Sequence, residues 1–165
     1  MTRSRLPLRA GRLAARFARD GRGATAIEFA ILGLPFLMLI ICIMQLGLYY
    51  MTQMALDGAT LKAAEGLRAN FGTGTTPVTP SGSTLKSTIV SGAATGIQSS
   101  GLIVEVQPLA NLGGGAVAIT DGLTSYGSAW TPLVLRSKYT MGVFMPGWGS
   151  TMSVYSSAIV RRQGQ

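Results

Sequence analysis

The chain has 165 residues, of which 12% are charged and 47% are apolar, and its mean hydropathy is +0.36. Soluble domains usually carry about 25% charged residues, so this composition indicates residence in a membrane. One cysteine and no histidine exclude an intrachain disulfide, Cys–His nucleophilic sites and the usual zinc sites. The net charge of +8 would suit a nucleic acid, but the excess lies at the N-terminus beside an apolar stretch, so we predict no nucleic-acid partner.

Reactive side chains are also scarce beyond the apolar stretch. The acidic residues there stand singly and suggest no carboxylate pair for acid–base chemistry: Asp57, Glu65, Glu105 and Asp121. We therefore predict no catalytic residue, no metal ligand and no cofactor, and we expect that the protein is not an enzyme.

Residues 1–23 form a basic leader in which seven arginines stand against one acid, Asp20. Several arginines recur at steps of three and four, so a helix would place them on one face, against the anionic headgroups of a cytoplasmic leaflet: Arg5, Arg9, Arg12, Arg16 and Arg19. By the positive-inside rule, such a leader keeps the N-terminus in the cytoplasm. A mitochondrial transit peptide is an alternative, because it is also rich in arginine and poor in acids. A secretory signal fits poorly, because its apolar region runs only about 7–15 residues.

Residues 24–56 are predicted to be one transmembrane helix. No charge lies between Glu28 and Asp57, and about 20 apolar residues suffice to cross a hydrocarbon core of about 30 Å. Pro35 removes one backbone hydrogen bond and is predicted to kink this helix. Membrane lipid is therefore an expected partner.

Polar and aromatic side chains are predicted to mark the outer end of the span, with the rings at headgroup depth: Gln45, Tyr49, Tyr50 and Gln53. The helical pattern continues over residues 57–71 and ends near Gly72. Its apolar positions fall on one face: Leu56, Ala59, Ala63, Leu67 and Phe71.

Residues 72–165 are predicted to form a small α+β domain outside the cytoplasm. A short helix is expected to start at a Thr84 cap, with apolar positions as far as Ile97. Strands are predicted at Leu102–Gln107, Ala116–Thr120, Leu133–Met141 and Met152–Val160, and the last two suit an antiparallel pair. Four aromatic residues are predicted to pack between sheet and helix: Trp130, Tyr139, Trp148 and Tyr155. As an alternative, exposed aromatic residues of the 144–148 loop are predicted to contact a partner subunit.

The junction between leader and span contains three small residues, Gly21, Gly23 and Ala24, and is predicted to be flexible and open to a protease. Gly23, followed by four residues and Glu28, resembles the processing motif of type IV pilins and pseudopilins. The pair Glu28-Phe29, with the later Pro35 and the long apolar run, more narrowly resembles the TadE-like minor pseudopilins of Tad (Flp-type) pilus systems. The resemblance implies a pilin-like fold and a prepilin peptidase that cuts after Gly23, which leaves Ala24 as the new N-terminus.

Glu28 has two readings. A carboxylate deep in a membrane helix is costly and is usually functional. One reading is an interfacial side chain that reaches back to water. The other, implied by the resemblance, is an ion pair between Glu28 and the new amine of Ala24, in its own or a neighbouring subunit.

The resemblance implies a minor pseudopilin required for building a Tad-type pilus involved in adhesion. Its expected partners are a prepilin peptidase, other minor and major pilins, and the pilus assembly machinery of the bacterial inner membrane. The expected location is that membrane, in a single pass with the C-terminal domain periplasmic or exposed on a pilus. The alternative function is a single-span envelope or binding protein that keeps its leader and is not a pilin. The quoted residues leave TadE-like and TadF-like proteins both open.

Overall fold

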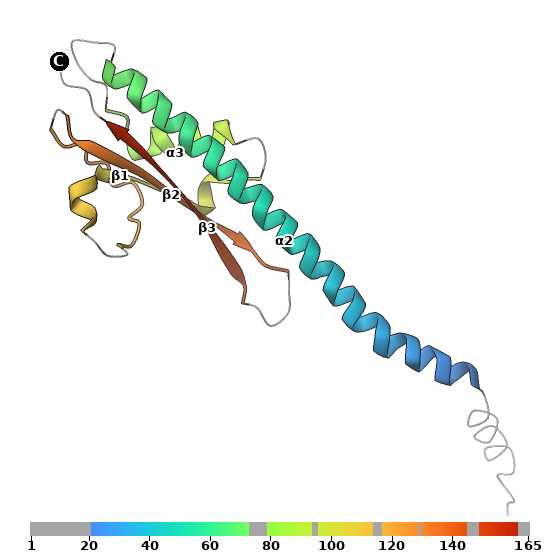
Figure 1. Ribbon diagram of the computed structural model, residues 1–165. Helices are drawn as coiled ribbons and strands as arrows, with labels where there is room; N and C mark the ends of the chain where they lie inside the picture. The colour runs from blue at the N-terminus through green and yellow to red at the C-terminus, as the bar shows by residue number, and fades with distance from the viewer. Residues whose placement is uncertain are drawn as a thin grey trace, which may run out of the picture. The chain divides into compact units, whose positions relative to one another are not determined.

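The computed structural model describes residues 21–72, 79–93, 96–113, 117–128, 130–144 and 149–161 (Figure 1). The chain divides into two compact units, Met1–Ile43 and Met44–Gln165. The proposed basic leader falls mostly on residues 1–20, outside the described residues, so its amphipathic helix stays a prediction.

The long helix α2 runs from Gly21 to Gly72 and passes through Pro35 without a break. The prediction of one continuous helix is confirmed, but α2 begins three residues before Ala24. Its first residues, Gly21–Ala24, are therefore helical, and their flexibility and openness to a protease stay predictions. The predicted kink at Pro35 remains a prediction.

One stretch of α2, Thr25–Phe71, is long and apolar enough to cross a membrane, with a mean hydropathy of 2.5 in its most apolar part. Within the described part of the chain it is the single such helix. This is a property of length and composition, and it is compatible with a single-pass membrane anchor.

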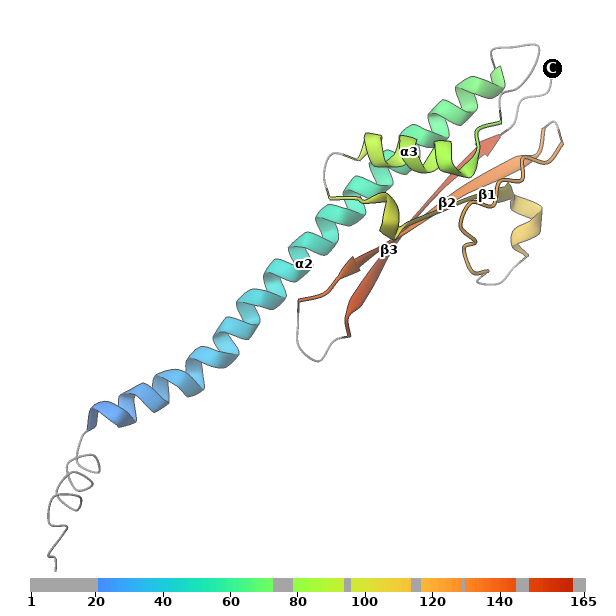
Figure 2. The same ribbon diagram turned by 180° about the vertical axis from the view of Figure 1, so that it is seen from behind.

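The second unit contains a three-stranded antiparallel sheet in the order β1-β2-β3. The strands are β1 (Leu102–Pro108), β2 (Pro132–Gly142) and β3 (Thr151–Arg161). The second helix, α3 (Gly82–Gly92), and the C-terminal half of α2 cover one face of the sheet, as Figures 1 and 2 show together. The predicted α+β class is thus confirmed.

The core lies between these helices and the sheet because both carry apolar residues at the matching period. The predicted face of α2 is buried in full: Leu56, Ala59, Ala63, Leu67 and Phe71. From the sheet, alternate residues face it, among them Val104, Val106, Leu133, Leu135, Val154 and Val160. The hydroxyl groups of Thr60 and Ser137 also meet there, 2.7 Å apart and without solvent access.

Helix α3 differs from its prediction at both ends. Its N-cap is Ser81, whose hydroxyl accepts a hydrogen bond from the backbone N–H of Thr84. It ends at Gly92, because Ala93 is extended and caps the helix through its N–H to the carbonyl of Ile89. Ile97 is buried nevertheless, from a non-helical position.

The predicted strand Ala116–Thr120 is wrong for residues 117–120, while Ala116 lies outside the described residues. These residues follow the short helix η2 (Leu109–Leu112) and cross the outer face of the sheet. Their backbone groups bond to side chains instead of a strand: Arg136 donates to the carbonyls of Val117 and Ala118, and Glu105 accepts from the N–H of Thr120. Because side chains form hydrogen bonds with these backbone groups, residues 117–120 do not have to pair with a strand.

Candidate functional site: the start of the long helix and its apolar surface

The predicted processing residues lie in the first turns of α2. Gly23 is exposed, and a Cβ atom added there would meet nothing within 4 Å. Glycine weakens a helix by about 0.5–1 kcal/mol relative to alanine, and two glycines, Gly21 and Gly23, stand within these first turns. The peptide bond between Gly23 and Ala24 thus lies within α2. The two glycines lower the free energy needed to unwind the helix there.

Glu28 is exposed and makes no ion pair within the described part of the chain. It follows Ala24 by four residues, a spacing that brings two positions of a helix onto the same face, about 5–6 Å apart at Cβ. Next to Glu28, the ring of Phe29 is 78% exposed.

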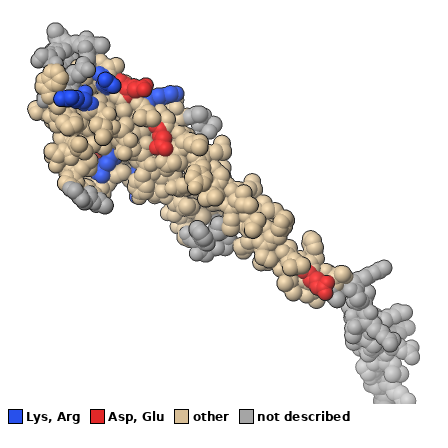
Figure 3. Space-filling view, in the orientation of Figure 1, with Lys and Arg blue, Asp and Glu red and all other residues tan. Residues whose placement is uncertain are grey.

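The surface of α2 after Glu28 is apolar and open. Large side chains from Phe29 to Met44 are exposed on all sides of the helix, among them Ile31, Leu34, Phe36, Leu39 and Ile43. This stretch has no charge until Asp57, and Figure 3 shows a nearly uncharged surface there, with charged side chains gathered on the globular part.

In the second unit, the face of α2 that does not pack on the sheet is also apolar. It exposes side chains at helical spacing: Met44, Leu48, Met51, Met54 and Leu61. From Thr25 to Leu61 an α-helix measures about 54 Å, which exceeds a hydrocarbon core of about 30 Å. The apolar surface is thus longer than a membrane span requires.

The residues predicted to mark the outer interface take different positions. Gln45 is buried, and its Oε1 accepts a hydrogen bond from the backbone N–H of Phe144, at 3.4 Å. Tyr49 and Tyr50 touch edge to face, with ring centroids 5.6 Å apart. Gln53 Nε2 donates to the carboxylate of Asp57 and to the carbonyl of β3 residue 155. The contact with Phe144 has no signal in the sequence, because the two residues are far apart in the chain.

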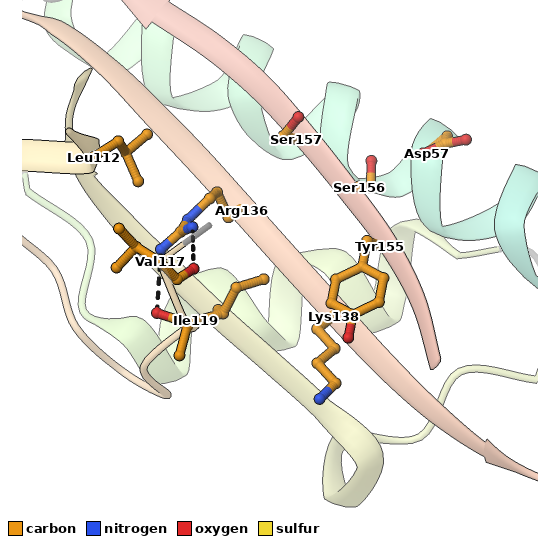
Figure 4. A pocket seen from close by; sticks show the side chains of 10 residues that line it. Asp57, Leu112, Val117, Ile119, Arg136, Lys138, Tyr155, Ser156 and Ser157 are labelled. Carbon is orange, nitrogen blue, oxygen red and sulfur yellow. Dashed lines mark hydrogen bonds between the residues drawn. The ribbon is translucent and has the colours of Figure 1, made fainter. Parts of the chain in front are cut away.

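The outer face of the sheet holds an open depression of about 930 Å³ (Figure 4). Arg136 and Lys138 rise from β2 into it, between Val117 and Ile119 on one side and Tyr155 on the other. Arg136 is fully engaged at its terminal nitrogens, since it forms a salt bridge of 2.8 Å to a buried acid of β1 besides its bonds to two carbonyls. Lys138 lies over the ring of Tyr155, 5.6 Å from its centroid. The site offers no charge pattern that selects one ligand.

The predicted packing of aromatic residues between sheet and helix is correct only for Tyr139, which is buried and donates its hydroxyl to the carbonyl of Gly96. Tyr155 and Trp130 are exposed, at 55% and 59%, so the prediction is wrong for them. Tyr155 points outward because it alternates with the core residue Val154 along β3. Trp148 lies outside the described residues.

Two titratable side chains of the globular part have shifted pKa values. The hydrogen bond from Lys86, at 3.0 Å, lowers the pKa of Asp121 below its ordinary value of 3.8, and burial opposes this shift only in part. Burial raises the pKa of Tyr126 to about 12. Its hydroxyl donates to the carbonyl of Pro80, and its ring touches Phe71 edge to face, so it holds the end of α2 to the start of α3.

Metal-ligating groups do not gather in the described part of the chain: no three side chains of His, Cys, Asp or Glu come together there. The sole cysteine of the sequence, Cys42, is half-buried in α2.

Comparison with known proteins gives one result, and it falls within α2. The family model described as TadE-like protein matches residues 23–65. No curated protein and no solved structure matches the chain. The match begins at Gly23 and includes Glu28, Phe29 and Pro35, the residues of the predicted motif. Over residues 23–65, about a quarter of its length, this chain is therefore similar to TadE-like proteins.

Proposed function

We propose that the protein is a minor pseudopilin required for assembly of a Tad-type pilus involved in adhesion, and that a prepilin peptidase matures it by cutting after Gly23. The observation that carries this proposal is that the TadE-like match starts at Gly23, at the head of a helix whose apolar surface is exposed. The protein is not an enzyme in this account. It is instead the substrate of the peptidase.

The processing step hydrolyses the peptide bond between Gly23 and Ala24. Proteases bind extended backbone, so the first turn of α2 has to unwind before cleavage. Gly21 and Gly23 lower the free energy of that unwinding, because glycine favours the helix less than any residue but proline. Cleavage removes a leader with a net side-chain charge of +6 and creates one positive amine.

The Glu28 carboxylate is the proposed ion-pair partner of the new amine. The charge of that amine at the first residue of a helix is unfavourable toward the helix dipole, and a carboxylate one turn later offsets it. The same carboxylate is able to bind the amine of a neighbouring subunit. In apolar surroundings such a pair is strong and fixes the register of two packed helices.

The basic leader supports an inner-membrane protein with a cytoplasmic N-terminus, by the positive-inside rule. Other minor and major pilins and the assembly machinery are the proposed partners. The exposed apolar face of α2 supports this, because it extends beyond the length that lipid covers and would otherwise remain in water.

Substitution at Gly23 tests the processing step. In the native host, we expect Gly23→Leu to retain residues 1–23, because a branched side chain blocks the peptidase and strengthens the helix there. Gly33→Leu, also within α2, is the matched control and should mature normally. The measurement is the intact mass of each membrane-extracted variant. Normal maturation of Gly23→Leu would refute the cleavage site, and cleavage at another position would indicate a different protease, as for a mitochondrial protein.

A further inference from the structure

The edge of the sheet formed by β3 carries a row of backbone groups that point away from β2. Val143 donates its N–H to the carbonyl of Ser150 at 3.1 Å, so this pair, the next in the β2–β3 register, is hydrogen-bonded. Hydrogen-bonded pairs alternate along an antiparallel ladder. The even-numbered residues of β3 therefore bond to β2, and the odd-numbered ones point their N–H and carbonyl groups outward. Gln53 agrees with this direction, because its Nε2 donates to the carbonyl of Tyr155 at 2.7 Å.

The two edges of the sheet differ. On the β1 edge, three backbone hydrogen bonds of 2.8–3.0 Å join Val104 and Val106 to residues 122–125. Within the described part of the chain, the bond from Gln53 is the one hydrogen bond to the outward backbone groups of β3. Natural edge strands often block the addition of another strand with charges or proline, but Thr151–Val160 contains neither. The β3 edge is thus open to pairing.

The depression on the outer face of the sheet extends to this edge. Tyr155, Ser156 and Ser157 are consecutive in β3, and all three line it together with Asp57 of α2 (Figure 4). Because consecutive residues of a strand face opposite sides of a sheet, a depression lined by all three passes around the strand edge. The depression by itself selects no one ligand, but the accessible edge within it fits an extended peptide.

A lysine lies beside the edge on the outer face. Lys138 is opposite Tyr155 in the ladder, and its Nζ extends over that ring, 5.6 Å from the centroid (Figure 4). Within the described residues it makes no ion pair, whereas the neighbouring Arg136 is paired with Glu105. In an added strand, the residue opposite Tyr155 has its side chain on the same face. A carboxylate at that position is able to reach the lysine ammonium.

We propose that β3 is a docking edge for an extended segment of another protein, which adds to the sheet as a further strand and places an acidic side chain against Lys138. Backbone hydrogen bonds to β3 supply affinity, and the acid supplies selectivity. A carbonyl has two lone pairs, so the bond from Gln53 to Tyr155 does not exclude the added strand. A second copy of this chain fits less well, because the one acid in its described strands, Glu105, is buried in its own salt bridge. The inference is independent of cleavage and of the membrane anchor.

Peptide binding to the full-length chain in detergent micelles tests the acidic contact. The probe is a fluorescein-labelled peptide of about nine residues, made of threonine and valine with glutamate at its centre, and its matched control has glutamine there. Fluorescence anisotropy measures both affinities. We expect the glutamate peptide to bind about threefold more tightly, as for an exposed cross-strand charge pair. Lys138→Gln should remove this difference, and Lys86→Gln, which changes a lysine of α3, should keep it.

N-methylation of the peptide backbone tests the strand pairing on the unchanged chain. Only one edge of an added strand faces β3, so methyl groups on alternate residues in one phase should weaken binding more than about tenfold, and those in the other phase by less than about twofold. Ser157→Pro is the matching change in the protein, because an edge strand tolerates proline where the N–H points outward. It should weaken binding to the same degree, with the fold checked by circular dichroism.

Several results would overturn the docking edge. They are a glutamate peptide that does not bind, equal effects of the two methylation patterns, a preference for glutamate that survives in Lys138→Gln, and a folded Ser157→Pro variant that binds as wild type does. If Ser157→Pro does not fold, the methylated peptides decide the question. Dimers of the chain in sedimentation, together with no peptide binding, would assign the edge to a second copy instead.

Discussion

Thr60 and Ser137 are the polar pair at the centre of an otherwise apolar contact between α2 and β2. Their hydroxyl groups lie 2.7 Å apart and neither side chain reaches solvent. Each satisfies the other, so the pair contributes little net stability, but either one alone would be a buried polar group without its partner. The sequence gives no sign of this pairing, because each residue by itself reads as an interruption of an apolar pattern.

We expect Thr60→Val alone to lower the free energy of unfolding by about 1–3 kcal/mol, because it leaves the Ser137 hydroxyl unsatisfied. The double variant Thr60→Val, Ser137→Ala should recover most of that loss. Urea unfolding of the detergent-solubilised chain, followed by circular dichroism, measures both. Additive losses in the double variant would show that the two hydroxyls are not coupled.

Asp121 makes a salt bridge with Lys86, which holds the pKa of the carboxyl below its unfolded value. A carboxyl with a lowered folded pKa adds stability above the unfolded pKa, and this contribution disappears as the pH falls through the folded pKa. The stability difference between wild type and Asp121→Asn should therefore be constant near neutral pH and shrink below about pH 4. It should stay under about 1 kcal/mol, because the pair is solvated and the Asp121 side chain is 52% exposed.

Urea titrations at a series of pH values measure this difference, and Lys86→Gln is the matched variant that removes the same pair from the other side. Both variants should show the same narrowing at low pH. A difference that persists unchanged into acid would mean that Asp121 acts through its backbone contacts, such as the N–H of Val104, and not through Lys86.

At the scale of elements, the sequence predicts best where one period runs long. The helical period of residues 56–71 predicts which face of α2 is buried, and the antiparallel pairing of β2 with β3 is also as predicted. The strand prediction fails at residues 117–120. The backbone carbonyls there accept hydrogen bonds from Arg136, and the N–H of Thr120 donates to Glu105. No local sequence pattern reveals these contacts. The 930 Å³ depression on the sheet and the contact of Gln45 with Phe144 likewise depend on residues distant in the chain.

The start of α2 is the element on which assembly depends in this account. We expect Glu28→Ala to leave cleavage after Gly23 largely intact and to impair pilus formation, because the new amine loses its carboxylate partner. Glu65→Ala, an exposed acid further along α2, is the matched control and should assemble normally. Electron microscopy of pili, together with the intact mass of each variant, separates the two steps. Wild-type piliation in Glu28→Ala would remove the ion pair from the mechanism.

At the scale of the whole molecule, the chain combines two parts. One is a helix with an exposed apolar surface, and the other is a small unit with its own core. The motif Gly23–Glu28, the family match and the exposed apolar surface of α2 all concern the helix. The globular unit carries no residue that the family resemblance assigns a role. Its fold is explained by the packing of α2 and α3 on the sheet.

The central claim is that the working protein begins at Ala24. Intact-mass analysis and N-terminal sequencing of the wild-type protein, extracted from the membranes of its native host, test this most directly. The account predicts a chain that lacks residues 1–23 and starts with a free or modified amine on Ala24. A functional chain that retains residues 1–23 in cells with an active prepilin peptidase would contradict it.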